Sequence, residues 1–163
     1  GGDTFRTGCG PVIGCRGSAM SSDDLLRFPP DGALLRKIRA KVRDMAGRHG
    51  AEPATCDNLA LVVDELVNNA VEHGASYRKH GHDLGVRIGL DGEYVVIEFF
   101  DPEMPLDQIE DLAAALADTA NGMPSLDSER GRGLFLLSVY LEGLLAETAT
   151  EGGLRLVGKI KLK

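Results

Sequence analysis

Apolar residues recur at helical spacing in two segments near the start of the chain. In residues 31–49 they stand three or four positions apart, with Asp31 suited to cap the start and Gly50 to follow the end. Residues 53–73 repeat this spacing and stop before Gly74. The pattern predicts two amphipathic helices, the first with a row of arginines and lysines on its outer face.

Strand-like segments dominate the remainder of the chain. Two pairs of β-rich segments flank Asp91-Gly92 and Gly152-Gly153, and a glycine-containing pair between such segments is a strong hairpin signal. A further short apolar segment ends at Pro29-Pro30, which is typical of an edge strand. The predicted strands cover residues 24–28, 84–90, 93–100, 144–150 and 154–162.

A long connection, residues 101–130, separates the two hairpins. It contains an alanine-rich helical stretch at 106–117 and is followed by a helical pattern at 132–141. The predicted helices thus follow one another along the chain and do not alternate strictly with strands, which favours an α+β fold. We expect a two-layer sandwich in which helices cover one face of a mostly antiparallel sheet; the alternative is a parallel, doubly wound sheet.

With 163 residues and a formal charge of −7, the chain has the size and balance of one globular domain. Residues 1–22 hold scattered glycine and serine without an apolar period, and we expect a flexible tail there. Met20 is a candidate native start, which makes residues 1–19 a candidate extension. The domain itself is expected to span residues 23–163.

The composition also excludes several classes of protein. Acidic residues outnumber basic ones by 25 to 18 and aromatic residues make up 5%, which argues against direct binding of nucleic acid. No apolar run approaches the roughly 20 residues of a membrane span, and no secretory signal pattern opens the chain. The three cysteines, Cys9, Cys15 and Cys56, fit neither a zinc site nor a disulfide framework. We therefore expect a cytoplasmic protein.

The predicted helix at residues 53–73 carries the most informative polar residues. Glu65, Asn69 and His73 follow one another at four-residue intervals along one flank of its apolar stripe. An amide oxygen is a suitable ligand for Mg²⁺, and a carboxylate one turn earlier can activate a hydroxyl group beside it. These three residues are therefore candidates to line a cleft; the alternative is that they form a solvated flank of the helix.

Two other segments carry candidate chemistry. The glycines of Arg130-Gly131-Arg132-Gly133-Leu134, at the start of a predicted helix, would let the backbone approach a phosphate, although a structural turn explains them equally well. The two arginines could face the same anion. Asp101 follows a predicted strand, where it could accept a hydrogen bond from the amino group of a base or serve as a turn residue.

Together these segments resemble a known family. Residues 65–74 (ELVNNAVEHG) resemble the N-box of the GHKL (Bergerat-fold) ATPases, and within them that of the anti-sigma-factor serine kinases of bacterial partner-switching systems. Residues 101–107 (DPEMPLD) fall where that family has a D-x-G-x-P-F-D segment, and residues 131–134 (GRGL) fall where it has its second glycine box. The resemblance covers roughly residues 24–162, and the N-box is its most specific part.

The resemblance implies a role for each candidate residue. Glu65 would be the general base that takes the proton of a substrate serine, Asn69 would coordinate Mg²⁺, and Asp101 would bind the adenine amino group. Residues 101–131 would form a mobile lid over the nucleotide. The residues implied to bind ATP are Asn69, His73, Asp101, Met104, Arg130, Gly131, Arg132, Gly133 and Leu134.

Two positions depart from the family pattern, both at the adenine end of the implied site. Glu103 stands where the family has a glycine. Leu154 stands where many relatives have a threonine that helps to hold adenine. These changes leave open either weak nucleotide binding or a binding fold without kinase activity.

The resemblance implies an ATP- and Mg²⁺-dependent protein serine/threonine kinase that also acts as an anti-sigma factor. It would phosphorylate an anti-sigma-factor antagonist of the STAS type, and it would bind a sigma factor when that antagonist is phosphorylated. The alternatives are a degenerate family member that binds a partner without turnover, and a kinase whose target is a scaffold protein. A homodimer is expected through the strand at residues 24–28, as in family members.

Overall fold

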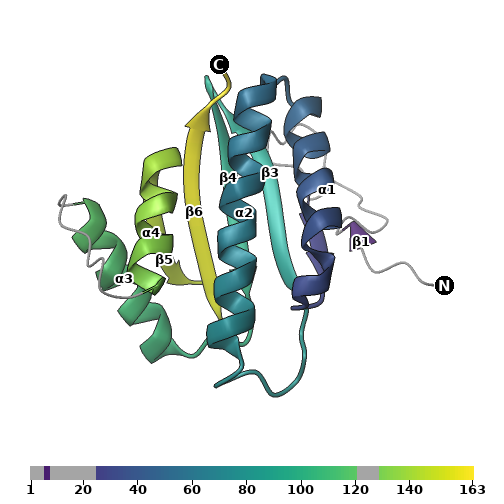
Figure 1. The fold of residues 1–163 in the computed structure, drawn as a ribbon. Coiled ribbons are helices and arrows are strands. Elements are labelled where there is room, and N and C mark those ends of the chain that lie inside the picture. The colour runs from purple at the N-terminus through teal and green to yellow at the C-terminus, as the bar shows by residue number, and fades with distance from the viewer. Residues whose placement is uncertain (1–5, 8–24, 121–128) are drawn as a thin grey trace.

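The structure, a computed structural model, describes residues 6–7, 25–120 and 129–163 (Figure 1). In these residues six strands form one sheet, in the order β1-β2-β3-β4-β6-β5, and every neighbouring pair is antiparallel. The antiparallel pairing confirms the predicted α+β class and excludes the parallel alternative. The strands are β1 (Arg6–Thr7), β2 (Leu25–Phe28), β3 (Leu84–Asp91), β4 (Tyr94–Asp101), β5 (Glu142–Thr148) and β6 (Leu154–Lys161).

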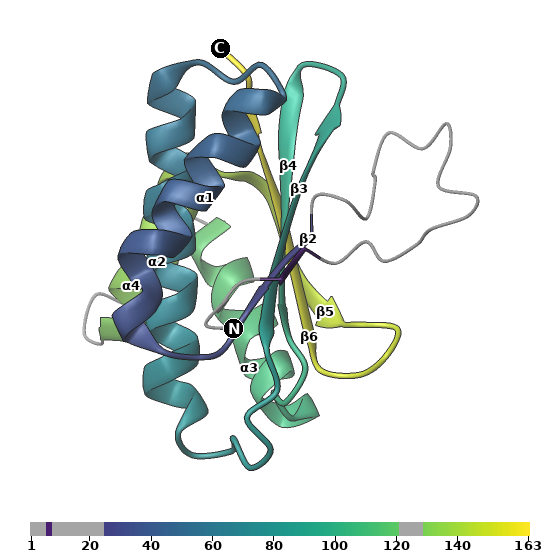
Figure 2. The same cartoon turned by 90° about the vertical axis from the view of Figure 1, so that its right-hand side faces the viewer.

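Helices cover one face of this sheet and complete a two-layer sandwich. Figure 2 shows α1 and α2 on the same side of β3 and β4, while α3 packs against β5 and α4. None of the described helices is both long and apolar enough to cross a membrane. The helical elements are the 3-10 turn η2 (Gly32–Leu34), α1 (Leu35–Arg48), α2 (Pro53–Gly74), α3 (Leu106–Ala120) and α4 (Glu129–Tyr140).

Local signals in the sequence explain where these elements begin and turn. The Asp31 carboxylate accepts a hydrogen bond from the backbone N–H of Ala33 (2.9 Å), which caps η2 at the entrance to α1. The β3–β4 hairpin turns one residue later than predicted, because Asp91 still pairs with Tyr94. Gly92 follows with a φ of +61°, a conformation that glycine adopts without strain.

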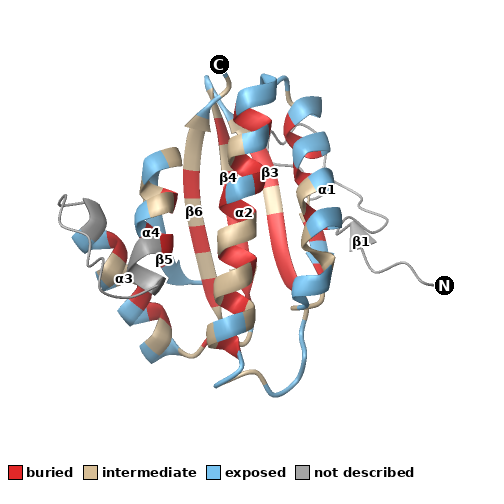
Figure 3. Cartoon of the chain, viewed as in Figure 1, coloured by how far each residue is buried: buried red, intermediate tan, exposed pale blue. Residues whose placement is uncertain are grey.

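The core fills the space between the helices and the sheet, as the buried residues in Figure 3 show. Successive side chains of a strand point to opposite faces, so Val95, Ile97 and Phe99 of β4 all face α2 and are buried. The same alternation carries Asp101, the last residue of β4, to the helix-covered face. The fold therefore buries a carboxylate in the interior near the end of α2.

Helix α3 occupies the first half of the predicted lid. It is three residues longer than the stretch predicted at 106–117, and it buries Ile109, Leu112 and Leu116 in the common core. Residues 121–128, which were also assigned to the lid, lie outside the described residues. The described half of this segment is thus a packed part of the domain.

The predicted edge strand, β2, has a neighbour on each side. β3 pairs with one side of it, and β1 pairs with the other at Leu26 and Arg27. Leu26 and Phe28 are buried in the core of their own chain. The prediction of an edge strand is therefore wrong, because residues 6–7 of the predicted tail supply a further strand. The rest of that tail lies outside the described residues.

Candidate functional site

Helix α2 presents Glu65, Asn69 and His73 on successive turns, and all three residues are half-buried. Their position between the apolar core and solvent follows from the four-residue spacing of the sequence. The preceding residue, Asp64, is fixed by Arg39 of α1, whose Nη1 lies 2.7 Å from Oδ1 of the carboxylate. The structure thus gathers the predicted polar row along one flank and ties its start to the neighbouring helix.

The Glu65 carboxylate lies against the beginning of α4. A Cβ atom added to Gly133 would lie 2.6 Å from Oε2 of Glu65 and 3.6 Å from Nδ2 of Asn69, so glycine leaves room for the carboxylate there. Burial raises the pKa of Glu65, and the negative charges of Asp64 and Glu72 raise it further. A carboxylate with a raised pKa is suited to accept a proton in a reaction near neutral pH.

Helix α4 begins at Glu129, three residues before the predicted start at Arg132. Gly131 therefore lies in the first turn of the helix and not in a loop before it. The N–H groups of a first turn have no partner within their helix and can bind an anion. Leu134 is buried in the core, whereas the side chains of Arg130 and Arg132 lie outside the described residues.

The carboxylate of Asp101 is fully buried and accepts four hydrogen bonds. Arg78 donates from Nη1 to Oδ1 (3.1 Å) and from Nη2 to Oδ2 (2.9 Å). The Tyr77 hydroxyl donates to Oδ2 (2.7 Å), and the backbone N–H of Glu103 donates to Oδ1 (3.2 Å). Burial alone would lower the pKa of Arg78, but the hydrogen bonds and charge of Asp101 outweigh it and raise that pKa. Asp101 thus holds the loop that follows α2.

Glu103 faces the same loop. Its Oε1 accepts hydrogen bonds from the backbone N–H groups of Lys79 (3.0 Å) and His80 (2.7 Å), and its Oε2 accepts one from His82 (2.9 Å). Burial would raise the pKa of Glu103, but these three donors and the charge of Arg78 outweigh it and hold the pKa at about 2. The residue that replaces the family glycine is therefore an anchor for residues 79–82.

Gly74, the last residue of α2, opens the path by which Arg78 reaches Asp101. A Cβ atom added to Gly74 would lie 2.9 Å from Nε and 3.0 Å from Cζ of Arg78. Arg78 also donates a hydrogen bond from Nη2 to the carbonyl oxygen of Ala70 (3.1 Å). Its guanidinium therefore crosses the C-terminal end of α2, where a cation is favoured by the unpaired helix carbonyls.

Among the described residues, a small cavity of about 30 Å³ lies beside this row, between α2, α4 and the sheet. Sites for small molecules usually measure about 300–1,000 Å³, so this cavity has no room for ATP in the observed conformation. Leu154, which replaces the family threonine, lies opposite Asp101 on β6 and helps to fill the space. Four residues of the predicted site line the cavity: Asn69, His73, Met104 and Leu134.

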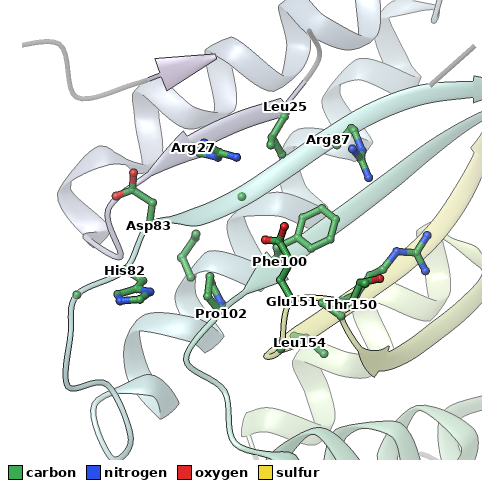
Figure 4. Close-up of a pocket in the computed structure, with 16 residues that line it drawn as sticks. Leu25, Arg27, His82, Asp83, Arg87, Phe100, Pro102, Thr150, Glu151 and Leu154 are labelled. Atoms are coloured by element: carbon green, nitrogen blue, oxygen red, sulfur yellow. The ribbon is translucent and has the colours of Figure 1, made fainter. Parts of the chain in front are cut away.

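A larger cavity, of about 900 Å³, lies on the opposite face of the sheet (Figure 4). It is bounded by the loop that precedes β3 and by the turn between β5 and β6. Two arginines on its wall, Arg87 and Arg155, each approach the buried carboxylate of Glu98 at 2.8 Å. None of the N-box residues lines this cavity, although Leu154 borders both cavities.

The residues present fit a magnesium ion that is held mainly by a nucleotide. In the part of the chain that the structure describes, no group of three or more His, Cys, Asp or Glu residues could hold a metal ion. Magnesium commonly keeps several water ligands and is bound by one or two protein oxygens together with substrate phosphates. Asn69 suits that arrangement, because it lies one turn beyond Glu65 and faces the start of α4.

Arg78 and Tyr77 were not predicted from the sequence as residues of the site. Both lie in a short polar loop without any periodic pattern, and Arg78 is 23 residues away from Asp101. One signal was available, because a carboxylate at the end of a buried strand needs a cation or several donors nearby. The sequence does not say which of its 18 basic residues supplies them.

Comparison with known proteins agrees with this geometry. The histidine kinase-like ATPase domain family matches residues 28–155, which include α2, Asp101 and the start of α4. A chain in the crystal structure of the SiaB–SiaC complex from Pseudomonas aeruginosa has the same fold, with a TM-score of 0.64 and 18% sequence identity over 83% of this chain and 88% of that chain. No curated protein gives a significant match. The chain belongs to the histidine kinase-like ATPase domain family, within the GHKL ATPases.

Proposed function

We propose that this chain is an ATP- and Mg²⁺-dependent protein serine/threonine kinase that also serves as an anti-sigma factor. The observation that carries the proposal is the approach of Glu65 to the start of α4, with Asn69 one turn further along α2. Phosphoryl transfer requires positioning and charge stabilisation more than covalent chemistry from the protein. A carboxylate with a raised pKa, an amide ligand and a helix start supply these requirements.

In the proposed reaction, Glu65 accepts the proton of the substrate hydroxyl as that oxygen bonds to the γ-phosphorus of ATP. The bond between the γ-phosphorus and the bridging oxygen breaks at the same time, and ADP leaves with the electron pair. Magnesium, when bound, neutralises phosphate charge, and Asn69 is the residue suited to hold it. The backbone N–H groups of residues 129–132 would bind phosphate oxygens.

The structural neighbour supports a protein partner for this chain, because SiaB forms a complex with SiaC. We propose that the phosphoryl acceptor is a STAS-type anti-sigma-factor antagonist and that a sigma factor is the alternative partner. Both would be met in the cytoplasm. Binding the antagonist and the sigma factor in turn would require no catalytic groups other than those on α2 and α4.

Calorimetric titration of the full chain with ATP and Mg²⁺ tests the proposal first, and it is expected to detect binding. The second measurement is transfer of the γ-phosphate from radiolabelled ATP to STAS-domain proteins of the source organism. Replacement Glu65→Ala is expected to slow transfer by about 10²- to 10⁴-fold, the usual contribution of a general base, with ATP affinity nearly unchanged.

The control is Glu93→Gln, which alters an exposed carboxylate in the turn between β3 and β4 and is expected to retain phosphoryl transfer. If the Glu65→Ala protein transfers phosphate at the wild-type rate, another group must be the general base. A titration without any ATP binding would overturn the kinase proposal.

A second candidate is a partner-binding module without nucleotide turnover. The small volume of the cavity, about 30 Å³, and the hydrogen bonds that already occupy the carboxylate of Asp101 favour it. Under this hypothesis the chain forms a stable complex with its protein partner, while the ATP titration gives no heat. The same calorimetric experiment therefore separates the two candidates.

We also propose a homodimer that uses the outer edge of β2. β1 covers that edge only at Leu26 and Arg27, so deletion of residues 1–19 would leave it open. If β2 forms the interface, light scattering should show at least as much dimer after the deletion as before it. A monomer in both samples would contradict the dimer.

A further inference from the structure

All four acceptor positions of the Asp101 carboxylate are already used within the chain. An ionised carboxylate has about four lone-pair sites. At Oδ1 they are filled by Arg78 and by the backbone N–H of Glu103, and at Oδ2 by Arg78 and the Tyr77 hydroxyl. An amino group of a nucleotide base can reach this carboxylate only if one of these donors leaves.

Arg78 is the donor that can leave most easily. The N–H of Glu103 belongs to the backbone next to Asp101, and Tyr77 is partly packed against the core. Arg78 instead reaches Asp101 from the loop after α2 on a long side chain with several rotatable bonds. It supplies two of the four hydrogen bonds, so its departure frees one position on each oxygen.

We propose that Arg78 competes with the base of a nucleotide for Asp101 and thereby sets the affinity and base preference of the cleft. The inference rests on the proposed function, because it assumes that a nucleotide binds between α2 and α4. An exocyclic amino group, as in adenine, donates a hydrogen bond and can replace one from Arg78. A carbonyl oxygen at the same position, as in guanine, cannot donate to a carboxylate.

Glu103 gives the displaced side chain a second partner. Its Oε2 lies 3.5 Å from Nη1 of Arg78, so the guanidinium can stay beside a carboxylate after it leaves Asp101. The three backbone hydrogen bonds to Glu103 keep the rest of the loop in place during that change. The residue that stands in the glycine position therefore makes exchange at Asp101 possible without an unpaired buried cation.

Two substitutions remove the competition in different ways. Arg78→Ala deletes the guanidinium. Gly74→Ala keeps it but places a methyl group on its path, within 3.0 Å of its present position, and the flexible end of Arg78 is the part that must move. Arg87→Ala is the matched control, because it breaks an arginine pair with another buried carboxylate, Glu98, on the far face of the sheet.

The experiment is calorimetric titration of the full-length wild type and these three variants with ATP and with GTP, in the presence of Mg²⁺. Both Arg78→Ala and Gly74→Ala are expected to bind ATP at least tenfold more tightly than the wild type. Their affinity for GTP should change by less than twofold, and Arg87→Ala should leave both affinities unchanged. Circular dichroism establishes that each protein is folded, and Gly74→Ala decides the matter if Arg78→Ala does not fold.

Equal ATP affinity in the wild type and in both test variants would overturn the inference and leave the kinase proposal intact. An equal gain in affinity for ATP and for GTP would also overturn the inference, because a general opening of the site would not distinguish between the two bases. Absence of ATP binding in every folded variant would instead overturn the proposed function on which the inference rests.

Discussion

The carboxylates at the two ends of the candidate site, near α4 and near the end of β4, lie in opposite electrostatic surroundings. At the end near α4, Glu65 is half-buried beside Asp64 and Glu72, and its pKa is raised. At the end near β4, Asp101 and Glu103 are almost fully buried, yet Arg78 and backbone N–H groups match their charge, and the pKa of Glu103 is about 2. Burial alone does not set the pKa of an acid, because the hydrogen-bond donors and charges around it also shift that pKa.

This difference fits the proposed role of Glu65 as a general base and the structural role of Asp101 and Glu103. An acid whose charge is poorly compensated can take up a proton at modest cost, which suits a general base. An acid such as Glu103, which accepts several hydrogen bonds, keeps its charge to a lower pH, because protonation would weaken those hydrogen bonds. We call the α4 end, where phosphates would lie in the proposed complex, the phosphate end, and the β4 end, where the nucleotide base would lie, the base end; at the base end the acids are already engaged by the chain itself. Substitutions at the two ends are therefore expected to have different effects on stability and on phosphoryl transfer.

The largest expected effect is on stability at the base end. Asp101→Asn leaves the guanidinium of Arg78, which is 11% exposed, without its buried counter-ion. Removal of one member of a buried pair usually costs about 3–5 kcal/mol, because the other charge remains desolvated. We expect a loss of this size in the free energy of unfolding, measured by urea denaturation. A loss below about 1 kcal/mol would show that the pair contributes little to the fold.

The second prediction concerns pH. The pKa of Glu103 falls from an ordinary 4.5 to about 2 in the folded state, so its contribution to stability is complete above about pH 5 and is lost as the pH falls toward 2. Each pKa unit corresponds to about 1.4 kcal/mol in a fully buried group, but solvent screens part of this interaction, so we expect a contribution of about 1 kcal/mol. Glu103→Gln removes this dependence.

Urea denaturation of both proteins between pH 7 and pH 3 measures the effect. The difference in unfolding free energy between the wild type and Glu103→Gln should shrink steadily below pH 5. A difference that stays constant over this range would mean that the carboxylate of Glu103 is not held by its donors.

A smaller effect on stability is expected at the phosphate end, combined with a clear effect on chemistry. In Gly133→Ala the new methyl group would lie 2.6 Å from Oε2 of Glu65, so the carboxylate must move aside. Alanine favours a helix by up to about 1 kcal/mol over glycine, which offsets the cost of that movement. We expect the rate of phosphoryl transfer, measured with radiolabelled ATP, to fall by about tenfold or more. The free energy of unfolding, measured by urea denaturation, should stay within about 1 kcal/mol of the wild-type value.

The smallest change in the free energy of unfolding is expected for Glu65→Gln, which should stabilise the protein, whereas Asp101→Asn should destabilise it. Because the pKa of Glu65 is raised in the folded state, its ionised form opposes folding above the ordinary pKa of 4.5. Glutamine removes this opposition, so stability at pH 7 should rise slightly, by about 0.5 kcal/mol or less. The gain should vanish below pH 4, and a loss of stability at pH 7 would contradict the contrast between the two ends.

Much of the fold could be predicted because its signals are local. The helix at Pro53–Gly74 follows from apolar spacing with a proline at one end and a glycine at the other. The β3–β4 hairpin follows from two β-rich segments around Gly92. The predicted edge strand failed because its outer neighbour, Arg6–Thr7, is only two residues long and lies in a segment without an apolar pattern.

Some residues of the candidate site could be predicted from the sequence and others could not. Glu65, Asn69 and His73 were predicted together because a single helix carries them at a constant spacing. The partners of Asp101 could not be predicted, because Arg78 and Asp101 belong to different elements and meet only through the packing of α2 on β4. Glu103 was recognised as a departure, but its role as an anchor for the loop depends on backbone groups of residues 79–82.

The sequence by itself therefore determined the α+β class, the main helices and hairpins and the polar row on α2, since each depends on the order of residues within one element. The tertiary structure alone decided that Glu65 faces Gly133, that Arg78 passes Gly74 to reach Asp101, and that the cavity beside α2 has a volume of only about 30 Å³. These outcomes depend on distances between separate elements. Such distances are set when the apolar faces of helices and sheet pack together, and local periodicity does not encode them.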